Sequence, residues 1–322
     1  HDLDFKRTGC RAIRSFKFKV SNSKSMNKLP TFSDIEKAHE RIRPYIHHTP
    51  VLSSQSINQI VGAELFFKCE NLQKVGAFKF RGACNSVFSL SDEEARHGVC
   101  THSSGNHAAA LALAARMCGI PAYIVMPENA PEIKKIAVAG YGAQITFCTP
   151  TLEARESTLK RVAAETGATE IHPYNYFNVI CGQGTAAKEL IEEIGQLDVV
   201  MAPVGGGGLL SGTAIATKAL LPGAKVIAAE PAGADDAFRS FYSKTLQPSV
   251  APKTIADGLL TSLGSLTFPI ILNEVDQIVT VSEEGIVAAM RMIWDRMKII
   301  IEPSSAVPLA AILENKVDVK GQ

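Results

Sequence analysis

The sequence feature that most restricts the fold of this chain is a regular alternation between short apolar segments and longer segments with helical periodicity. The apolar segments have the length of strands, and the predicted strands are 98–103, 122–126, 143–148, 169–172, 197–204 and 225–230. The helices expected between them are 106–118, 131–140, 152–166 and 182–194. Alternation of this kind indicates consecutive strand–helix units and mainly parallel sheets. We therefore expect an α/β fold of two lobes with a cleft between them.

Further elements are predicted outside this alternating region. Ser33 and Glu36 have the spacing of a capping box and are expected to begin a helix. Residues 63–70 are rich in apolar and aromatic side chains and are expected to form a buried strand just before the next helix. The elements predicted nearest the C-terminus are a strand at 277–281 and helices at 283–298 and 303–313.

Composition argues against several classes of protein. The 322 residues are 46% apolar and carry a formal net charge of +1, so no basic surface for nucleic acid is expected. The longest apolar run, 108–126, is interrupted by Arg116, Gly119 and Pro121, so no membrane span is predicted. The seven cysteines are scattered and never spaced as CxxC, which indicates reduced thiols. These properties favour small-molecule chemistry in the cytoplasm.

Residues 1–27 differ in composition from the rest of the chain. They are basic and rich in serine, and their only acids are Asp2 and Asp4. This composition predicts either a transit peptide, which would indicate an organelle, or a disordered extension. In both cases the fold is expected to begin after this segment.

Lys79 is the candidate nucleophile. It lies in the stretch 73–83, QKVGAFKFRGA, where Phe78 and Phe80 flank it and small residues leave the backbone bare. Desolvation by these neighbours, together with the positive charge of Arg81, would lower the pKa of its amine, and a neutral amine can form a Schiff base. The alternative is a structural lysine whose stem lies on apolar neighbours while its amine stays in water.

A candidate anion site closes one predicted strand and opens the next helix. The segment 101–107 reads THSSGNH, and consecutive backbone N–H groups at a helix N-terminus can bind a carboxylate. Ser104 and Asn106 could also direct their side chains toward a cofactor. The alternative is an N-cap without a ligand, because Ser and Asn are favoured at that position.

A second candidate anion site is the run of four glycines from Gly205 to Gly208 after an apolar strand. It suits either a dinucleotide, with Glu230 as the ribose-binding acid, or the single phosphate of a compact cofactor. The dinucleotide pattern GxGxxG fails, because a third glycine would be needed at position 211, which is Ser211. We therefore favour a single phosphate, and Lys79 supplies the amine that pyridoxal phosphate requires.

Acidic residues gather in the segment EPAGADDA. Glu230, Asp235 and Asp236 could bind Mg²⁺ or Ca²⁺ together with backbone carbonyl oxygens. The alternative is a solvated helix N-terminus at which acids interact favourably with the helix dipole.

Taken together, several motifs resemble those of one enzyme family. They are GAFKFRGA, THSSGNHAAAL, GGGG, AAEPAGADDA, TIADG at 254–258 and IEPSSA at 301–306. Over residues 31–322 the chain resembles the fold-type II pyridoxal-phosphate enzymes, which are tryptophan synthase β-like. Within them it is most similar to the plant-type serine racemases, with threo-3-hydroxyaspartate dehydratases and threonine dehydratases as near relatives. The resemblance implies two open, twisted, mainly parallel sheets flanked by helices, with the cofactor in the cleft.

The same resemblance implies a role for each candidate residue. Lys79 would form the Schiff base and act as the base on one face of the substrate, and Ser104 would act on the other face. The residues implied in cofactor binding are Phe78, Lys79, Asn106, Gly205, Gly206, Gly207, Gly208 and Leu209. Those implied in binding the substrate carboxylate are Ser103, Ser104, Gly105, Asn106 and His107. Mg²⁺, Ca²⁺ or Mn²⁺ would bind Glu230, Asp236 and the carbonyl oxygen of Ala234.

The activity implied is racemisation of L-serine to D-serine, accompanied by dehydration of serine to pyruvate and ammonia. Threonine dehydratases usually carry alanine where this chain has Ser104, which favours a racemase. The alternatives are a threo-3-hydroxyaspartate or threonine dehydratase and, from other classes, an NAD-dependent oxidoreductase or a non-catalytic sensor. A homodimer is also implied, with a small domain at 93–171 and a large cofactor-binding domain at 28–92 and 172–322.

The chain departs from the family pattern at two places. The family's SGGN turn, whose serine contacts the pyridine nitrogen, does not occur before Gln322, so we expect the sequence to be truncated. Vertebrate racemases contact ATP through a glutamine at the position of Ala109, and Val75 also departs from their nucleotide contacts. These two differences argue against ATP as an effector. The positions that do match those contacts are Glu36, Ser54, Lys74 and Tyr141.

Overall fold

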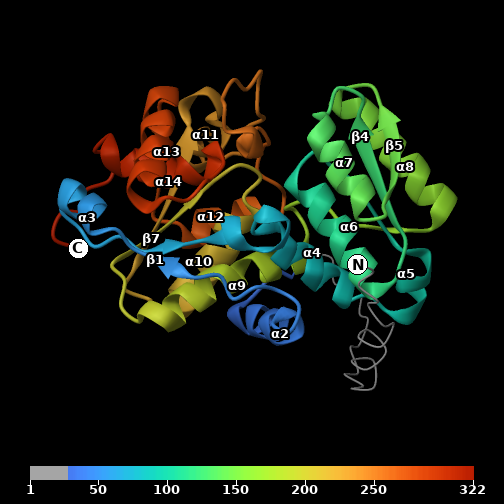
Figure 1. Ribbon diagram of the computed structural model, residues 1–322, viewed down its shortest axis with the longest axis horizontal. Coiled ribbons are helices and arrows are strands. Elements are labelled where there is room, and N and C mark those ends of the chain that lie inside the picture. The colour runs from blue at the N-terminus through green and yellow to red at the C-terminus, as the bar shows by residue number, and fades with distance from the viewer. Residues whose placement is uncertain (1–27) are drawn as a thin grey trace. The chain divides into compact units, whose positions relative to one another are not determined.

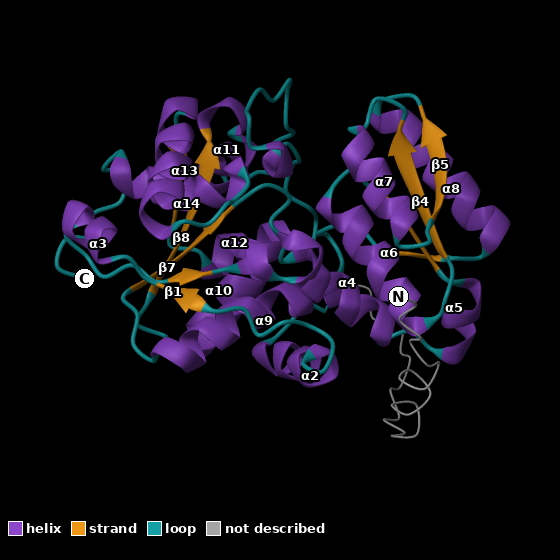
Figure 2. Cartoon of the chain, viewed as in Figure 1, coloured by secondary structure: helices purple, strands orange, loops and turns teal. Residues whose placement is uncertain are grey.

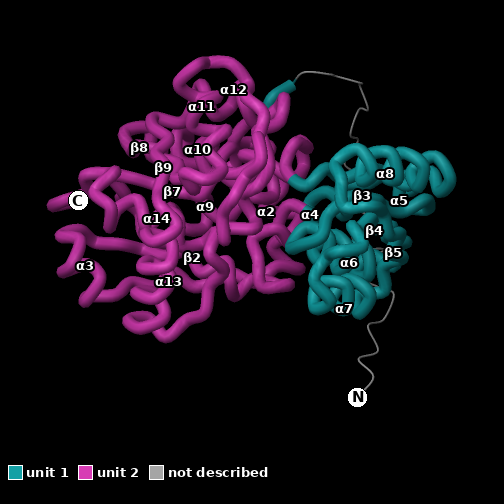
Figure 3. Tube along the Cα trace, turned by 90° about the horizontal axis from the view of Figure 1, so that it is seen from above, with its two compact units in different colours: residues 1–29, 83–173 teal, residues 30–82, 174–322 magenta. Residues whose placement is uncertain are grey.

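The computed structural model of the protein describes residues 28–322, so the prediction of a transit peptide in 1–27 lies outside the described residues. Residues 83–173 belong to one compact unit, and residues 30–82 and 174–322 form the other (Figure 3). Within the described part of the chain, no helix combines the length and the hydropathy needed to cross a membrane.

The unit of residues 83–173 is built on a four-stranded parallel sheet in the order β5-β4-β3-β6. Its strands are β3 (Val99–His102), β4 (Ala122–Pro127), β5 (Gln144–Cys148) and β6 (Thr169–Glu170). Its helices are α5 (Asp92–His97), α6 (Asn106–Cys118), α7 (Glu132–Gly140) and α8 (Leu152–Thr166). Helices α6 and α7 lie on one side of the sheet and α8 on the other (Figure 1). The predicted alternation of strands and helices is confirmed here.

The other unit is organised around a three-stranded parallel sheet in the order β7-β8-β9. Its strands β7 and β8 are labelled in Figure 2. The strands are β7 (Val199–Pro203), β8 (Lys225–Pro231) and β9 (Gln277–Val281). The helices are α2 (Phe32–Ile42), α3 (Gln55–Val61), α9 (Phe177–Ile194), α10 (Gly208–Leu220), α11 (Asp236–Ser243), α12 (Thr267–Glu274), α13 (Glu283–Met297) and α14 (Pro303–Leu313).

Side chains of β8 alternate between two hydrophobic clusters, because successive residues of a strand point to opposite faces. Val226 and Ala228 pack with residues of α10 and α12, whereas Ile227 and Ala229 pack with residues of α13 and α14. Both faces of this sheet are therefore buried, as is usual for parallel sheets.

Two predictions before Lys79 were wrong. Helix α2 begins at Phe32, because Thr31 caps it and the Asp34 carboxylate accepts hydrogen bonds from the Thr31 N–H and Oγ1, at 3.1 and 2.7 Å. Residues 63–70 do not form one buried strand. Only β2 (Phe67–Lys68) is extended, and it pairs antiparallel with β1 (Val51–Leu52).

Candidate active site

Lys79 is the first residue of α4 (Lys79–Phe88). The backbone reaches it through two 3₁₀ turns, η1 (Glu70–Leu72) and η2 (Lys74–Gly76), and not directly from a strand. Inside the second turn Val75 has φ 60°, a left-handed conformation that is rare for a β-branched residue. Strain of this kind persists only where the surrounding structure enforces it.

The amine of Lys79 has an unusually low pKa. The side chain is half-buried, and its Nζ lies 5.3 Å from the centre of the Phe78 ring. Desolvation lowers the pKa of Lys79 from 10.5 to about 8, and the negative charge of Glu302 opposes part of this shift. A substantial fraction of the amine is therefore neutral near physiological pH, which nucleophilic attack on a carbonyl requires.

Arg81 does not act on Lys79 in the way the sequence suggested. Its guanidinium is fully buried and donates to the carboxylates of Glu70 and Glu189 at distances between 2.7 and 2.8 Å. These two acids neutralise its charge, so the low pKa of Lys79 comes from desolvation. The expected contribution of a neighbouring cation was wrong.

The four glycines connect β7 to the N-terminus of α10. Gly207 has φ 86°, a conformation that favours glycine, and it is the N-cap of the helix. A Cβ on Gly206 would lie 2.3 Å from ring atoms of Tyr174, so no larger residue fits. Bare N–H groups at the start of a helix of 13 residues make this turn suitable for a phosphate.

Contacts between motifs connect the glycine turn with the surroundings of Lys79. A Cβ on Gly205 would lie 2.9 Å from Cα of Leu259, in the turn that follows TIADG. In that turn the Gly258 N–H donates to Ser304 Oγ at 3.2 Å, next to Glu302, whose charge acts on Lys79. Three motifs that are far apart in the sequence therefore belong to one local structure.

The segment of residues 103–107 belongs to the other unit, where it joins β3 to α6. The Gly105 N–H donates to Ser103 Oγ at 3.3 Å, and Asn106 is the first helical residue. The ring of His107 is buried and its Nε2 lies 3.0 Å from the carbonyl oxygen of Ile171, so only its backbone is suited to a ligand.

Two basic groups near this segment were missed by the sequence analysis. The Lys134 amine lies 3.7 Å from the position that a Cβ on Gly105 would take. Desolvation lowers the pKa of His102, at the end of β3, and the nearby charge of Arg155 lowers it further. Nothing in the spacing of Lys134 and Arg155 along the chain connects either residue with the motif THSSGNH.

The acidic segment contains two carboxylates that are costly to ionise. Glu230 is buried at the end of β8 and accepts from the N–H groups of Ala237 and Phe238, at 3.0 and 2.8 Å. Asp236 is 1% exposed, and both oxygens of its carboxylate are buried. Desolvation raises the pKa of Glu230 to about 9 and that of Asp236 to about 6.

This arrangement bears on two earlier interpretations. Asp235 forms an ion pair with Arg239 at 2.8 Å, and its negative charge adds to desolvation in raising the pKa of both buried acids. Residues 28–322 contain no group of three or more His, Cys, Asp or Glu side chains arranged for a metal, so a cation at Glu230 and Asp236 would need backbone oxygens as well. Because Glu230 is buried against α11, it is not available to a ribose.

Comparison with known proteins identifies the fold. A family described as "Pyridoxal-phosphate dependent enzyme" matches residues 42–322. The serine racemase of Dictyostelium discoideum is 55% identical over 288 residues, 89% of each chain. The beta-hydroxyaspartate dehydratase of Paracoccus denitrificans is 53% identical, covering 89% of this chain and 91% of that protein. The structure of maize serine racemase superposes with a TM-score of 0.88 at 48% identity, covering 90% of this chain and 88% of that one. The predicted fold class is confirmed.

Proposed function

Because the chain belongs to the family of pyridoxal-phosphate dependent enzymes, we propose that it racemises serine and also dehydrates it to pyruvate and ammonia. The proposal depends on the low pKa of Lys79 and on the contacts that place the glycine turn in the same local structure as this lysine. An amine and a phosphate site fit the two ends of the cofactor. The high identity to serine racemases favours serine as the substrate.

Lys79 would hold pyridoxal phosphate covalently, since its neutral amine can condense with the aldehyde and release water, and the substrate amine would then free the lysine. Pyridoxal phosphate, when bound, withdraws electrons from the substrate Cα and so acidifies its proton. The released amine of Lys79 then accepts this proton. Burial keeps the amine a weak enough base to release the proton again at physiological pH.

The remaining residues bind and orient the ligands. The phosphate is assigned to the N–H groups of Gly205 to Gly208 and of Leu209, and the ring to Phe78 and Asn106. The substrate carboxylate is assigned to the backbone of residues 103–107, where the amine of Lys134 adds a positive charge.

The side chain of Ser104 is assigned to proton transfer on the face opposite Lys79. If Ser104 donates its hydroxyl proton to Cα, the product is the enantiomer of the substrate. If the β-hydroxyl instead takes up a proton and leaves as water before Cα is reprotonated, the product is an enamine. Water hydrolyses this enamine to pyruvate and ammonia. Both activities therefore share the removal of one Cα proton.

Substitution of Ser104 tests this assignment. In Ser104→Ala we expect racemisation to be lost by about 100-fold or more, while elimination from L-serine remains, because proton transfer by a positioned group contributes about that factor. Both rates can be measured on one sample by chiral chromatography and pyruvate detection. Equal loss of the two activities would contradict a separate role for Ser104. A yellow absorption band that borohydride removes, leaving the cofactor on Lys79, tests the central assignment directly.

A second candidate is the dehydration of threo-3-hydroxyaspartate, with threonine as a related substrate. It is supported by 53% identity to the beta-hydroxyaspartate dehydratase of Paracoccus denitrificans. The additional positive charge of Lys134 near residues 103–107 would suit a substrate with a second carboxylate. A kcat/KM higher for threo-3-hydroxyaspartate than for serine would establish this alternative.

We also propose a divalent cation bound by Glu230, Asp236 and the carbonyl oxygen of Ala234. The buried carboxylate of Asp236, whose pKa is raised by desolvation, fits this role because a cation would compensate its charge. Since the pKa of Glu230 is about 9, cation binding at pH 7 should release about one proton per site. Calorimetry with Mg²⁺ in buffers of different ionisation enthalpy measures this release. Asp236→Asn should abolish it, and proton release that is unchanged in the variant would contradict the site.

The predicted homodimer and cytoplasmic location remain proposals. Val287 and Trp294 lie seven residues apart on one face of α13 and are 45% and 64% exposed, and Ile300 beyond the helix is 80% exposed. A second copy of the chain would cover such a face, and light scattering on Trp294→Arg should then show a monomer. All six described cysteines are free, which suits a reducing compartment.

A further inference from the structure

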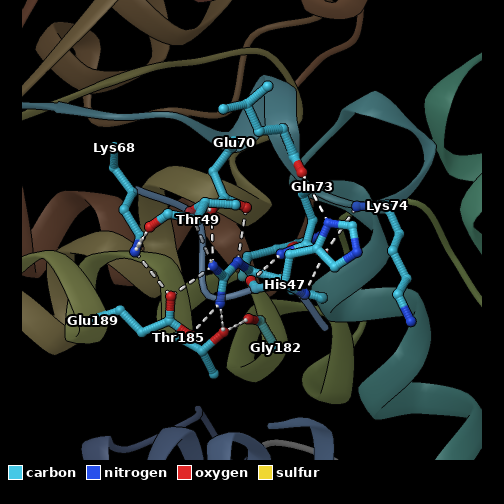
Figure 4. A network of polar contacts seen from close by, with 12 residues as sticks. His47, Thr49, Lys68, Glu70, Gln73, Lys74, Gly182, Thr185 and Glu189 are labelled. Carbon is cyan, nitrogen blue, oxygen red and sulfur yellow. Dashed lines mark hydrogen bonds and ion pairs between the residues drawn. The ribbon is translucent and has the colours of Figure 1, made fainter. Parts of the chain in front are cut away.

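Glu70 and two side chains of helix α9 together satisfy the hydrogen-bonding capacity of Arg81, two residues after Lys79. Arg81 Nη1 and Nη2 donate to Glu189 Oε1 and Oε2, both at 2.8 Å, and Nη1 also donates to Thr185 Oγ1 at 3.1 Å. Nε and Nη2 donate to the two oxygens of Glu70 at 2.7 and 2.8 Å. Figure 4 shows Glu70, Thr185 and Glu189 directed toward one another around this network. A planar guanidinium held at two carboxylates has one allowed orientation.

The charges of this network balance, so its effect on Lys79 is not that of a cation. Lys68 Nζ lies 2.9 Å from Glu189 Oε2 and donates to the carbonyl oxygen of Thr49 at 2.7 Å. Two basic and two acidic side chains are thus paired, and His39 Nε2 lies 3.2 Å from Glu189 Oε1. Buried ion pairs contribute little net stability compared with apolar packing. Such a network instead fixes the relative positions of the side chains and backbone segments that it joins.

A backbone contact between the same two helices reinforces this geometry. A Cβ on Gly182 would lie 2.6 Å from the carbonyl oxygen of Arg81 and 2.6 Å from Cα of Gly82, so α9 lies directly against the first turn of α4. The Gly82 N–H also donates to Gln183 Oε1 at 3.2 Å. Side-chain and backbone contacts therefore fix the same turn, which begins at Lys79.

We propose that Glu189 and Gly182 are positioning residues for Lys79: through Arg81 and Gly82 they hold the first turn of α4 so that the lysine amine stays desolvated. This inference rests on the proposed function of Lys79. Helix α9 would then act on the reaction indirectly, through Arg81 and Gly82.

The test uses variants that change geometry without changing charge. Glu189→Asp shortens the carboxylate by one CH₂ and weakens the two-point bond to Arg81, and Gly182→Ala displaces the backbone of Arg81. Each has a matched control on the same helix. Glu192→Asp changes an acid that pairs with Lys188 at the surface. Gly184→Ala introduces a Cβ that meets Ile35 and Gly212 instead of α4.

The measurement follows the holoenzyme after hydroxylamine has removed its cofactor. Pyridoxal phosphate is added back between pH 6 and 10, and borohydride trapping with peptide mapping gives the rate of attachment at Lys79. In Glu189→Asp and Gly182→Ala we expect the apparent pKa of attachment to rise by about one unit toward that of an ordinary lysine, which lowers the rate at pH 7 about tenfold. The controls should keep the parent profile.

The outcomes separate the two proposals. If the parent attaches the cofactor at Lys79 and both variants keep its pH profile while losing only thermal stability, α9 is merely structural and the inference is overturned. If the controls shift as much as the variants, the effect is not specific to α4 and the inference also fails. Attachment of the cofactor elsewhere in the parent overturns the proposed function of Lys79 and, with it, this inference. Thr185→Val, which removes one bond to Arg81, serves as a milder variant should Gly182→Ala not fold.

Discussion

Replacing Lys79 with methionine should stabilise the cofactor-free protein at neutral pH. The fold lowers the pKa of Lys79 from 10.5 to about 8, so at pH 7 the protonated amine is less stable in the folded than in the unfolded chain. A shift of about 2.5 units at about 1.4 kcal/mol per unit corresponds to about 3 kcal/mol. Methionine has a similar length and no charge, and Lys79→Met should recover most of this energy.

The pH dependence gives this prediction its direction. Between pH 8 and 10.5 the unfolded chain binds more protons at Lys79 than the folded protein does, so parent stability rises with pH across this window. Below pH 8 the penalty is fully present, and above pH 10.5 it is absent. The advantage of Lys79→Met should therefore be about 3 kcal/mol at pH 7 and should approach zero near pH 10.5.

Urea unfolding of the two cofactor-free proteins at pH 7, 9 and 10.5 measures the difference. Lys316→Met, at an exposed position, controls for the general effect of replacing a lysine and should show no such trend. A variant that is less stable than the parent at pH 7, or whose advantage does not change with pH, would refute the reasoning. Lys79 would then be as well solvated in the folded protein as in the unfolded chain.

Two further predictions concern the glycine turn and the turn that precedes Lys79. Gly206→Ala places a Cβ 2.3 Å from the Tyr174 ring and should weaken pyridoxal-phosphate binding at least tenfold, as measured by fluorescence titration. Gly223→Ala, whose Cβ would have no atom within 4 Å, should leave the affinity unchanged. Val75→Gly relieves a left-handed φ of 60° and should raise stability by about 0.5–1 kcal/mol while slowing turnover, and an unchanged melting temperature would show that the turn is not strained.

Local sequence signals accounted for most of the parallel architecture. Apolar runs followed by helical periodicity located both sheets, since a buried parallel strand needs little more than continuous apolar residues. The start of α9 was missed because its N-cap, Tyr176, carries no capping side-chain bond and gives no sequence signal. Segment 63–70 was misassigned because its apolar residues predict burial but not pairing: only Phe67 and Lys68 pair with another strand, and a 3₁₀ turn begins at Glu70.

The candidate site shows the same limit of local reasoning. Lys79 and the four glycines could be identified from the sequence because the residues adjacent to them indicate their chemical roles. The neutralisation of Arg81 could not, because Glu189 lies 108 residues away along the chain. Glu302, whose charge opposes the shift, is still farther from Lys79 in the sequence, and only the fold places it where it acts on the amine.

These long-range partners explain how the fold can tolerate an amine that opposes folding. A desolvated lysine in a mobile turn would move into water and recover its normal pKa, because solvation of the ammonium ion is favourable by several kcal/mol. The turn that carries Lys79 is held by a fully bonded guanidinium and by helix contacts at glycine, neither of which depends on the protonation of the amine. The rigidity of the turn around Arg81 is therefore what allows the desolvation cost at Lys79 to persist. If that rigidity is lost, the Lys79 amine should become solvated and the cost should disappear.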